Sequence, residues 1–398
     1  MNTIEIGWID YSTDHRKKVL SVLHALSEPG AVDELGIGMI RDGFADILFP
    51  GTSTLQTRAK YFFIVPYILM ELEKENLSAV KLQEKLERTE VELIEILKKN
   101  NKRGVIGGRA GTSLKRKPSS IYWNGLRTFG FLKHQGLSLS HYARAVTSLN
   151  KDMELLKSLG NEEQDDSGFS NELSGTFWRC LLPPKDWKEH IDMDLTYEEA
   201  LYLKQRIMTS PLSKDSLFSH LLQYDEEFVR QLEGFDWIGE LTNLPSHIQE
   251  DYSLAERFNQ FIKGANIRYN VLLSNGENHK SVDKWEQWLN SEFVLNEFGT
   301  FDYHQVLRRL GIHNMKLMRF LGNWKKAVAS KKLEEIDSLI IKREIELKSR
   351  DRAKLNNTKN YVYKDENDWV GSENLHYRFN DAKNIMMDIF EGLKQEDA

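Results

Sequence analysis

Apolar residues recur along most of the chain at the spacing of amphipathic helices. Segment 19–26 has apolar positions three and four residues apart, and Pro29 and Gly30 end that pattern. A short strand-like segment, 4–9, precedes it, and the almost wholly apolar segment 59–72 predicts a further helix. These elements form the first block of the chain.

The second block, residues 78–160, is predicted to contain three short helices and a basic connection. The pattern favours helices over 78–87, 89–97 and 121–133. The second helix begins at Thr89, which a glutamate follows at the spacing of a capping box. Three short helices with a basic connection are typical of a helix-turn-helix or winged-helix unit.

The third block begins after an acidic, polar segment, 161–170, whose composition is typical of a linker. Residues 171–398 are predicted to be helical with long loops. Their clearest elements are a capping box that starts at Thr196, a highly charged helix at 331–354 and an amphipathic helix at 379–393.

The three blocks together predict a mainly α, multi-helical fold with a helix-turn-helix or winged-helix-like unit in the N-terminal half. We expect an N-terminal signature region at 1–77, the small helical unit at 78–160 and a C-terminal helical domain at 171–398. A length of 398 residues is typical of more than one domain, and eight prolines are few for that length, which favours helix.

Charge and composition narrow the class of protein. The net charge of −6 means that any contact with a polyanion has to come from a local patch. Cys180 is the one cysteine, which excludes disulfide frameworks and zinc ribbons. Glu5 and Asp10 lie where a signal peptide needs an uncharged core, and the longest apolar run, 61–70, is half the length of a membrane span. We therefore expect a cytoplasmic protein without membrane association.

One segment, 98–117, is strongly basic and rich in glycine. It contains no acidic residue, and its glycines allow the backbone to approach a polyanion closely. A Walker loop is excluded because no Gly-Lys-Ser/Thr sequence closes it. The alternative is a plain surface loop. The eight basic residues are Lys98, Lys99, Lys102, Arg103, Arg109, Lys115, Arg116 and Lys117.

A second candidate segment runs from Arg41 to Lys60. Asp42 and Asp46 are four residues apart on a predicted helix, so they share a face that is able to hold Mg²⁺ or act as an acid/base pair. Internal salt bridges are the alternative for these carboxylates. Arg41, Arg58 and Lys60 are candidates to extend the basic surface.

Other candidate chemistry is sparse. The histidines show no pair at the spacing of a metal-binding helix face, so we predict no metal site, no cofactor and no catalytic residue. Tyr122 and Trp123 follow the basic segment and are of the residue types that stack on bases, but core packing is the favoured interpretation.

Several segments of the chain resemble one uncharacterised bacterial family, numbered 6361 among the domains of unknown function. The resemblance is carried by residues 34–61, which include Gly36, the Arg41-Asp42 pair and the run from Pro50 to Arg58. The start at residues 7–10 and the late segments 375–378 and 388–389 are also similar, so the resemblance extends over nearly the whole chain.

The resemblance implies a place beside helicase and phospholipase-D-type nuclease genes in prokaryotic defence islands, and hence an accessory role in antiviral defence. It supplies no catalytic residue. The leading hypothesis is therefore a non-enzymatic, nucleic-acid-associated accessory protein that contacts the phosphate backbone through the basic segment, with DNA expected before RNA.

Two other hypotheses are open at the level of the sequence. In the first, the chain is a protein–protein adaptor that docks a helicase or nuclease partner through the apolar segment 61–72 or the charged helix 331–354. In the second, it is a metal-dependent nuclease built on Asp42 and Asp46.

Overall fold

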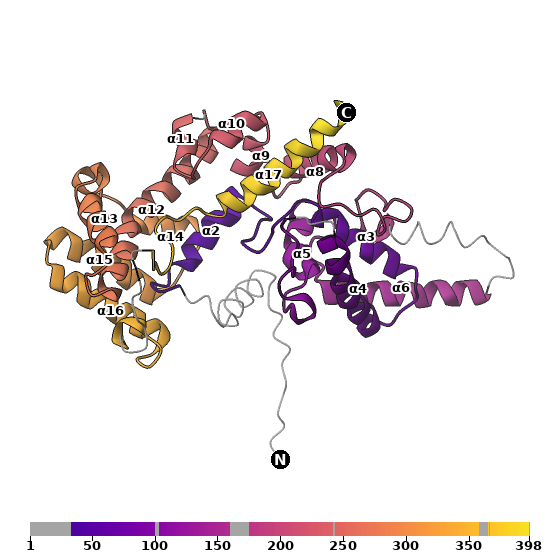
Figure 1. Cartoon of the computed structure of the whole chain (residues 1–398), viewed down its shortest axis with the longest axis horizontal. Helices are drawn as coiled ribbons and strands as arrows, with labels where there is room; N and C mark the ends of the chain where they lie inside the picture. The colour runs from indigo at the N-terminus through magenta and orange to yellow at the C-terminus, as the bar shows by residue number, and fades with distance from the viewer. Residues whose placement is uncertain are drawn as a thin grey trace, which may run out of the picture. The chain divides into compact units, whose positions relative to one another are not determined.

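The computed structural model describes residues 33–99, 103–159, 175–241, 243–357, 365 and 367–397 (Figure 1). These residues are mainly helical, as the sequence predicts. The strand-like segment 4–9, the helix at 19–26, the linker 161–170 and Lys102 lie outside the described residues.

The described residues form two compact units, and each is discontinuous in sequence. Unit 1 contains the described residues up to Met39 together with the segment Asn259–Asn374, and unit 2 contains Ile40–Phe258 with the segment from Leu375 onward. This division does not follow the three consecutive blocks expected from the sequence.

Unit 2 holds most of the helices and the basic segment. Its largest helix contacts are those of α17 with α8, of α4 with α6 and of α3 with α5. Its helices are α3 (Tyr61–Glu73), α4 (Ala79–Lys99), α5 (Pro118–Thr128), α6 (Leu139–Leu159), α8 (Tyr197–Thr209), α9 (Leu217–Leu221), α10 (Glu226–Gln231), α11 (Trp237–Leu241) and α17 (Phe379–Leu393), with short 3-10 turns at Gly111–Ser113 and Lys394–Asp397.

Unit 1 is a smaller helical assembly in which α15 packs on α16. Two helices, α2 (Gly38–Leu48) and α12 (Ser246–Leu273), contribute residues to both units. The other helices of unit 1 are α13 (His279–Leu289), α14 (Tyr303–Arg309), α15 (Met315–Ser330) and α16 (Leu333–Lys348), with a π-turn at Phe293–Glu297 and a 3-10 turn at Lys354–Asn356.

Two of the three short helices predicted for the second block are one helix. Helix α4 runs through Thr89, whose side chain is buried, and its apolar stripe continues from Leu82 to Leu97. The capping-box sequence does not begin a helix there because no glycine or proline interrupts the chain before it. The third predicted helix is α5, which ends at Thr128.

A winged-helix unit is not confirmed. Among the described residues the β-pairing is one isolated antiparallel bridge, between Leu132 of this block and Trp178 outside it, rather than the hairpin of a wing.

Helix α3 is the core of unit 2. Every residue from Tyr61 to Met70 is buried, and aromatic side chains of α5 and the following turn pack against Phe62 and Phe63. A helix that is apolar on all sides belongs in an interior. The proposal that segment 61–72 docks a partner is therefore wrong.

Other predicted elements are confirmed. The Thr196 side chain accepts a hydrogen bond from the Glu199 amide at 3.2 Å and begins α8 as a full capping box. Helix α17 has the predicted bounds, and α16 occupies most of the charged segment 331–354. No helix in the described ranges is both long enough and apolar enough to cross a membrane.

Candidate nucleic-acid interface

The basic loop, which we define as residues 103–117, joins α4 to α5 in unit 2 and has an ordered backbone. Its turns are closed by hydrogen bonds from the Gly108 amide to the Val105 carbonyl at 3.1 Å and from the Gly111 amide to the Gly107 carbonyl at 2.8 Å. Gly104, Gly107 and Gly111 have positive φ angles of 80°, 81° and 53°, which favour glycine.

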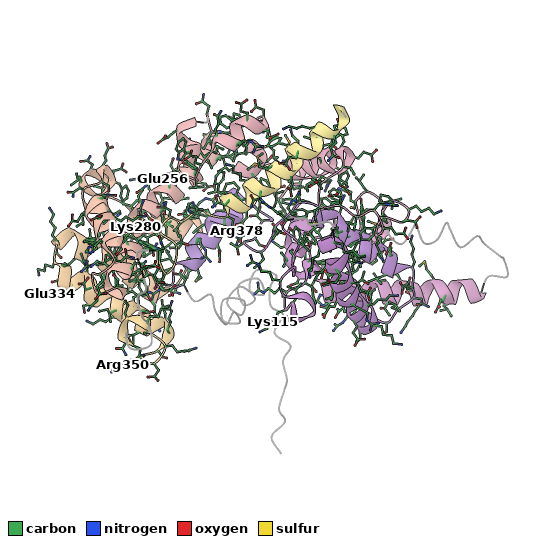
Figure 2. The ribbon with its side chains drawn as sticks, in the orientation of Figure 1. Lys115, Glu256, Lys280, Glu334, Arg350 and Arg378 are labelled. Atoms are coloured by element: carbon green, nitrogen blue, oxygen red, sulfur yellow. The ribbon has the colours of Figure 1, made fainter. Side chains whose placement is uncertain are left out.

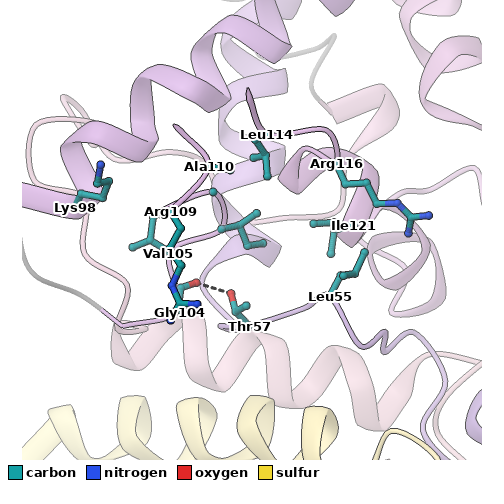
Figure 3. Close-up of a pocket in the computed structure, with 13 residues that line it drawn as sticks. Leu55, Thr57, Lys98, Gly104, Val105, Arg109, Ala110, Leu114, Arg116 and Ile121 are labelled. Carbon is teal, nitrogen blue, oxygen red and sulfur yellow. Dashed lines mark hydrogen bonds between the residues drawn. The ribbon is translucent and has the colours of Figure 1, made fainter. Parts of the chain in front are cut away.

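The loop is attached to the start of α3 and to the segment before it. Ile106 is buried, and its amide donates to the Tyr61 hydroxyl at 2.9 Å. The Thr57 hydroxyl donates to the Gly104 carbonyl (Figure 3). The Arg58 guanidinium donates to the Arg103 carbonyl at 3.4 Å. Residues 57–61, at the start of α3 and just before it, therefore hold the backbone of the basic loop in place.

Two glycines of the loop serve different purposes, and this leads to a matched prediction. A Cβ on Gly107 would lie 2.7 Å from Ile94 Cδ1 and 2.8 Å from Leu114 Cδ2, whereas nothing lies within 4 Å of a Cβ on Gly111. We expect Gly107→Ala to lower the free energy of unfolding by about 2–4 kcal/mol, and Gly111→Ala by about 1–2 kcal/mol, the cost of the left-handed backbone alone.

Urea denaturation of both variants at pH 7 measures this difference. Equal destabilisation by the two substitutions would contradict the packing assigned to Gly107.

An open hollow of about 860 Å³ lies against the loop. Its described lining contains no carboxylate, and three of its lining residues are Lys98, Arg109 and Arg116. Figure 3 shows Lys98 and Arg116 on opposite sides of the hollow, with Leu114 and Ile121 in its wall. The hollow therefore combines an apolar floor with a positively charged rim.

Most of the basic residues that were predicted to contact nucleic acid lie at the surface of this region. Lys98 is 42 % exposed and pairs with Glu95 at 3.3 Å. The others that are exposed are Lys99, Arg103, Arg109, Lys115 and Arg116, and Lys115 is labelled in Figure 2. Lys117 differs, because it is half-buried and its ammonium donates to the Leu114 carbonyl at 2.7 Å.

A buried carboxylate lies beneath the end of the loop. Glu90 of α4 is 2 % exposed and accepts hydrogen bonds from the Ser119 amide and, at 3.1 Å, from the Ser119 hydroxyl, at the start of α5. Burial raises the pKa of Glu90 to about 7, although the Ser119 bonds and the charge of Lys117 oppose the rise.

Arg58 does not contribute to the exposed basic surface. Its guanidinium contacts both oxygens of Asp388 at 2.8 and 3.0 Å and Asp194 at 2.7 Å, and its side chain is 17 % exposed. The Ala59 amide also donates to Asp388, at 2.6 Å. Burial raises the pKa of Asp388, and the Arg58 guanidinium opposes that rise.

Lys60 and Arg41 also have partners within the chain. Buried Lys60 contacts Glu199 at 2.6 Å, and Arg41 contacts the adjacent Asp42 at 3.2 Å. The expected extension of the basic surface by Arg41, Arg58 and Lys60 is thus reduced to Arg41, which is 41 % exposed.

The carboxylates of Asp42 and Asp46 share a helix face, as predicted. The guanidinium of Arg378 lies between them. Arg378 contacts Asp46 at 2.6 Å and Asp42 at 3.5 Å. These two carboxylates therefore form internal salt bridges, which was the alternative to a metal site or an acid/base pair. In the part of the chain that is described, no cluster of three or more His, Cys, Asp or Glu residues is arranged to hold a metal ion.

Tyr122 and Trp123 are core residues, as favoured from the sequence. Tyr122 is wholly buried against Tyr61 and Phe62, and its hydroxyl accepts from the Thr57 amide at 3.0 Å. Trp123 packs on Trp178 and donates to the Leu137 carbonyl at 2.9 Å. Neither ring is available to stack on a base.

The acidic partners of this region were not found from the sequence. Asp388 and Asp194 are far from Arg58 along the chain, and Glu90 lies on a helix among several exposed glutamates. One local signal existed for Glu90: it occupies the apolar stripe of α4, four residues after Leu86 and three before Leu93.

The comparisons with known proteins give one match. No curated protein and no solved structure matches the chain. The model of a family described as "Family of unknown function (DUF6361)" matches residues 3–284, which is about seven tenths of the chain. The match includes α3, α4, the basic loop and α5. The chain therefore belongs to this family of unknown function, DUF6361.

Proposed function

We propose that the protein is a non-enzymatic, nucleic-acid-associated accessory component of a prokaryotic antiviral defence system that contacts the phosphate backbone through its basic loop. The observation that carries the proposal is the arrangement of exposed cations around a hollow whose described lining has no carboxylate. Lysine and arginine side chains with accessible backbone amides are the groups that bind phosphates. The defence role rests on the resemblance described above.

The attachment of the loop supports this function. Ile106, Thr57 and Tyr61 fix the backbone of the loop, so little backbone conformational entropy is lost on binding. In this proposal the connection between α4 and α5 takes the part that the wing takes in a winged helix. A helicase or nuclease would be the partner protein of the defence system.

The test is a titration of nucleic acid against a loop variant, Arg103→Gln/Arg109→Gln/Lys115→Gln, at about 50 and 200 mM salt. Lys117 is left intact because its ammonium closes the loop onto Leu114. We expect affinity to fall at least about tenfold and the log–log salt dependence to become shallower by about three.

The matched control is Lys81→Gln/Lys151→Gln/Lys214→Gln, which removes three exposed cations of the same unit outside the loop. Affinity and salt dependence equal to those of this control would show that the basic loop does not contact the phosphates.

A further inference from the structure

A second acid-free segment lies in unit 1, far from the basic loop in sequence. Residues 303–333 contain eight lysines and arginines and no aspartate or glutamate. Residues 303–330 form α14, a connection at 310–314, and α15, and the last two lysines of the segment follow α15. The segment is thus two successive helices with a strong excess of positive charge.

The connection between these helices is a tight, defined turn. Gly311 has a φ of +63°, its amide donates to the Arg308 carbonyl at 3.2 Å, and the Ile312 amide donates to the Leu307 carbonyl at 2.9 Å. This pair of bonds is a Schellman ending for α14. The Asn314 side chain then caps α15 by accepting from the amides of residues 316 and 317, both at 3.1 Å.

Helix α15 has sharply different faces. Its inner face is buried and contains Trp324, whose indole donates to the Phe261 carbonyl at 2.9 Å. Its outer face is exposed and carries Arg319, Asn323 and Lys326 at intervals of three and four residues. Among the described residues, neither Arg319 nor Lys326 has a carboxylate within ion-pair distance.

An open hollow of about 820 Å³ runs beside this outer face, between α15 and residues 299–304. The Tyr303 side chain packs on α15 at Gly322, where an added Cβ would lie 2.8 Å from the tyrosine hydroxyl. The one carboxylate in the described lining, Asp302, contacts Arg308 at 3.0 Å. The positive charge of the outer face is therefore not neutralised from within the hollow.

We propose that α14 and α15 form a helix-turn-helix unit whose second helix binds in the major groove of duplex DNA. A helix with its side chains is 10–12 Å wide, and the major groove is about 12 Å wide. Arginine and asparagine are the side chains that pair bidentately with guanine and adenine edges, and the first helix of such units crosses the phosphate backbone. This site consists of other residues than the basic loop, so either proposal can fail alone.

The experiment measures binding of the full chain to a mixed-sequence 30-bp DNA duplex and to the same sequence as duplex RNA. The α15 variant is Arg319→Gln/Asn323→Ala/Lys326→Gln. Its control, Lys280→Gln/Lys342→Gln, removes two exposed cations of the same unit (Lys280 is labelled in Figure 2). Far-UV circular dichroism through thermal unfolding checks that both variants fold.

We expect the α15 variant to bind duplex DNA at least about tenfold more weakly than the control, with a salt dependence shallower by about two. We also expect the intact chain to prefer DNA over RNA duplexes, because the deep, narrow major groove of A-form RNA excludes a helix.

Three results would overturn the inference. The first is DNA binding by a folded α15 variant at the strength of the control, and the second is equal affinity for the two duplexes. The third is that the outer face of α15 binds an acidic protein surface and does not bind DNA. If only the basic-loop variant loses DNA binding, this inference is overturned and the proposed function stands. If only the α15 variant loses DNA binding, the proposed function is overturned and this inference stands.

Discussion

Replacing Arg58 with methionine is expected to lower the free energy of unfolding by about 3–5 kcal/mol. The substitution keeps much of the aliphatic stem and removes the guanidinium that contacts Asp388 and Asp194. The Asp388 side chain, 9 % exposed, would keep the hydrogen bond from the Ala59 amide and lose its counter-charge. Equilibrium urea denaturation at pH 7 measures the change.

Two further variants make this result interpretable. Arg103→Met removes an exposed cation of the basic loop and should change stability by less than about 0.5 kcal/mol. The double variant Arg58→Met/Asp388→Asn should be more stable than Arg58→Met alone, because an uncharged amide still accepts from the Ala59 amide. A loss below about 1 kcal/mol in Arg58→Met would show that the buried pair does not hold unit 2 together.

Replacing Glu90 with glutamine is expected to stabilise the protein above neutral pH. The pKa of Glu90 is raised from 4.5 to about 7, so between these values the folded chain binds a proton that the unfolded chain has released. The contribution of Glu90 to stability therefore falls as pH rises from about 4.5 to 7, by about 3 kcal/mol in total. Glutamine cannot ionise and keeps an oxygen that accepts from Ser119.

The measurement is the difference in unfolding free energy between Glu90→Gln and the parent protein across pH 4.5 to 8. We expect little difference at the acidic end and an advantage approaching about 3 kcal/mol for the variant at pH 8. Glu92→Gln, an exposed substitution on the same helix, should stay within about 0.5 kcal/mol throughout. A pH-independent difference for Glu90→Gln would refute the assigned titration.

The helices that the sequence predicts best are those with a capping box or with a strong amphipathic pattern over their whole length. Helix α8 begins at a capping box, and α17 has a strong alternation of buried and exposed positions over its whole length. Thr89 shows the limit of this reasoning. Its capping-box spacing lies inside α4, where the continuous apolar stripe decides the structure.

The sequence predicts the charge of the candidate site. It does not predict how the side chains of the site are arranged or which residues they contact. The cations of 98–117 are visible in the sequence, and most of those described are exposed. Arg58 and Lys60 carry the same charge, but they pair with the buried carboxylates of Asp388 and Glu199, which lie more than 130 residues away in the sequence. Sequence spacing holds no information about such partners, because tertiary packing alone brings them together.

The α14–α15 unit had a sequence signal that the division into blocks did not use. A glycine between two amphipathic segments, Gly311, and the absence of acidic residues from 303 to 333 are both visible without a structure. The turn geometry and the separation of the faces of α15 were needed to distinguish this segment from an ordinary charged region.

The contact of Arg58 with Asp388 bears on how the family match should be used in choosing expression boundaries. The match ends at residue 284, but the carboxylate that holds Arg58 and the Ala59 amide comes from α17, about a hundred residues later. A polypeptide trimmed to the matched segment would lack that helix and leave the support of the basic loop incomplete. Truncated forms intended for binding studies therefore need to retain residues 375–397.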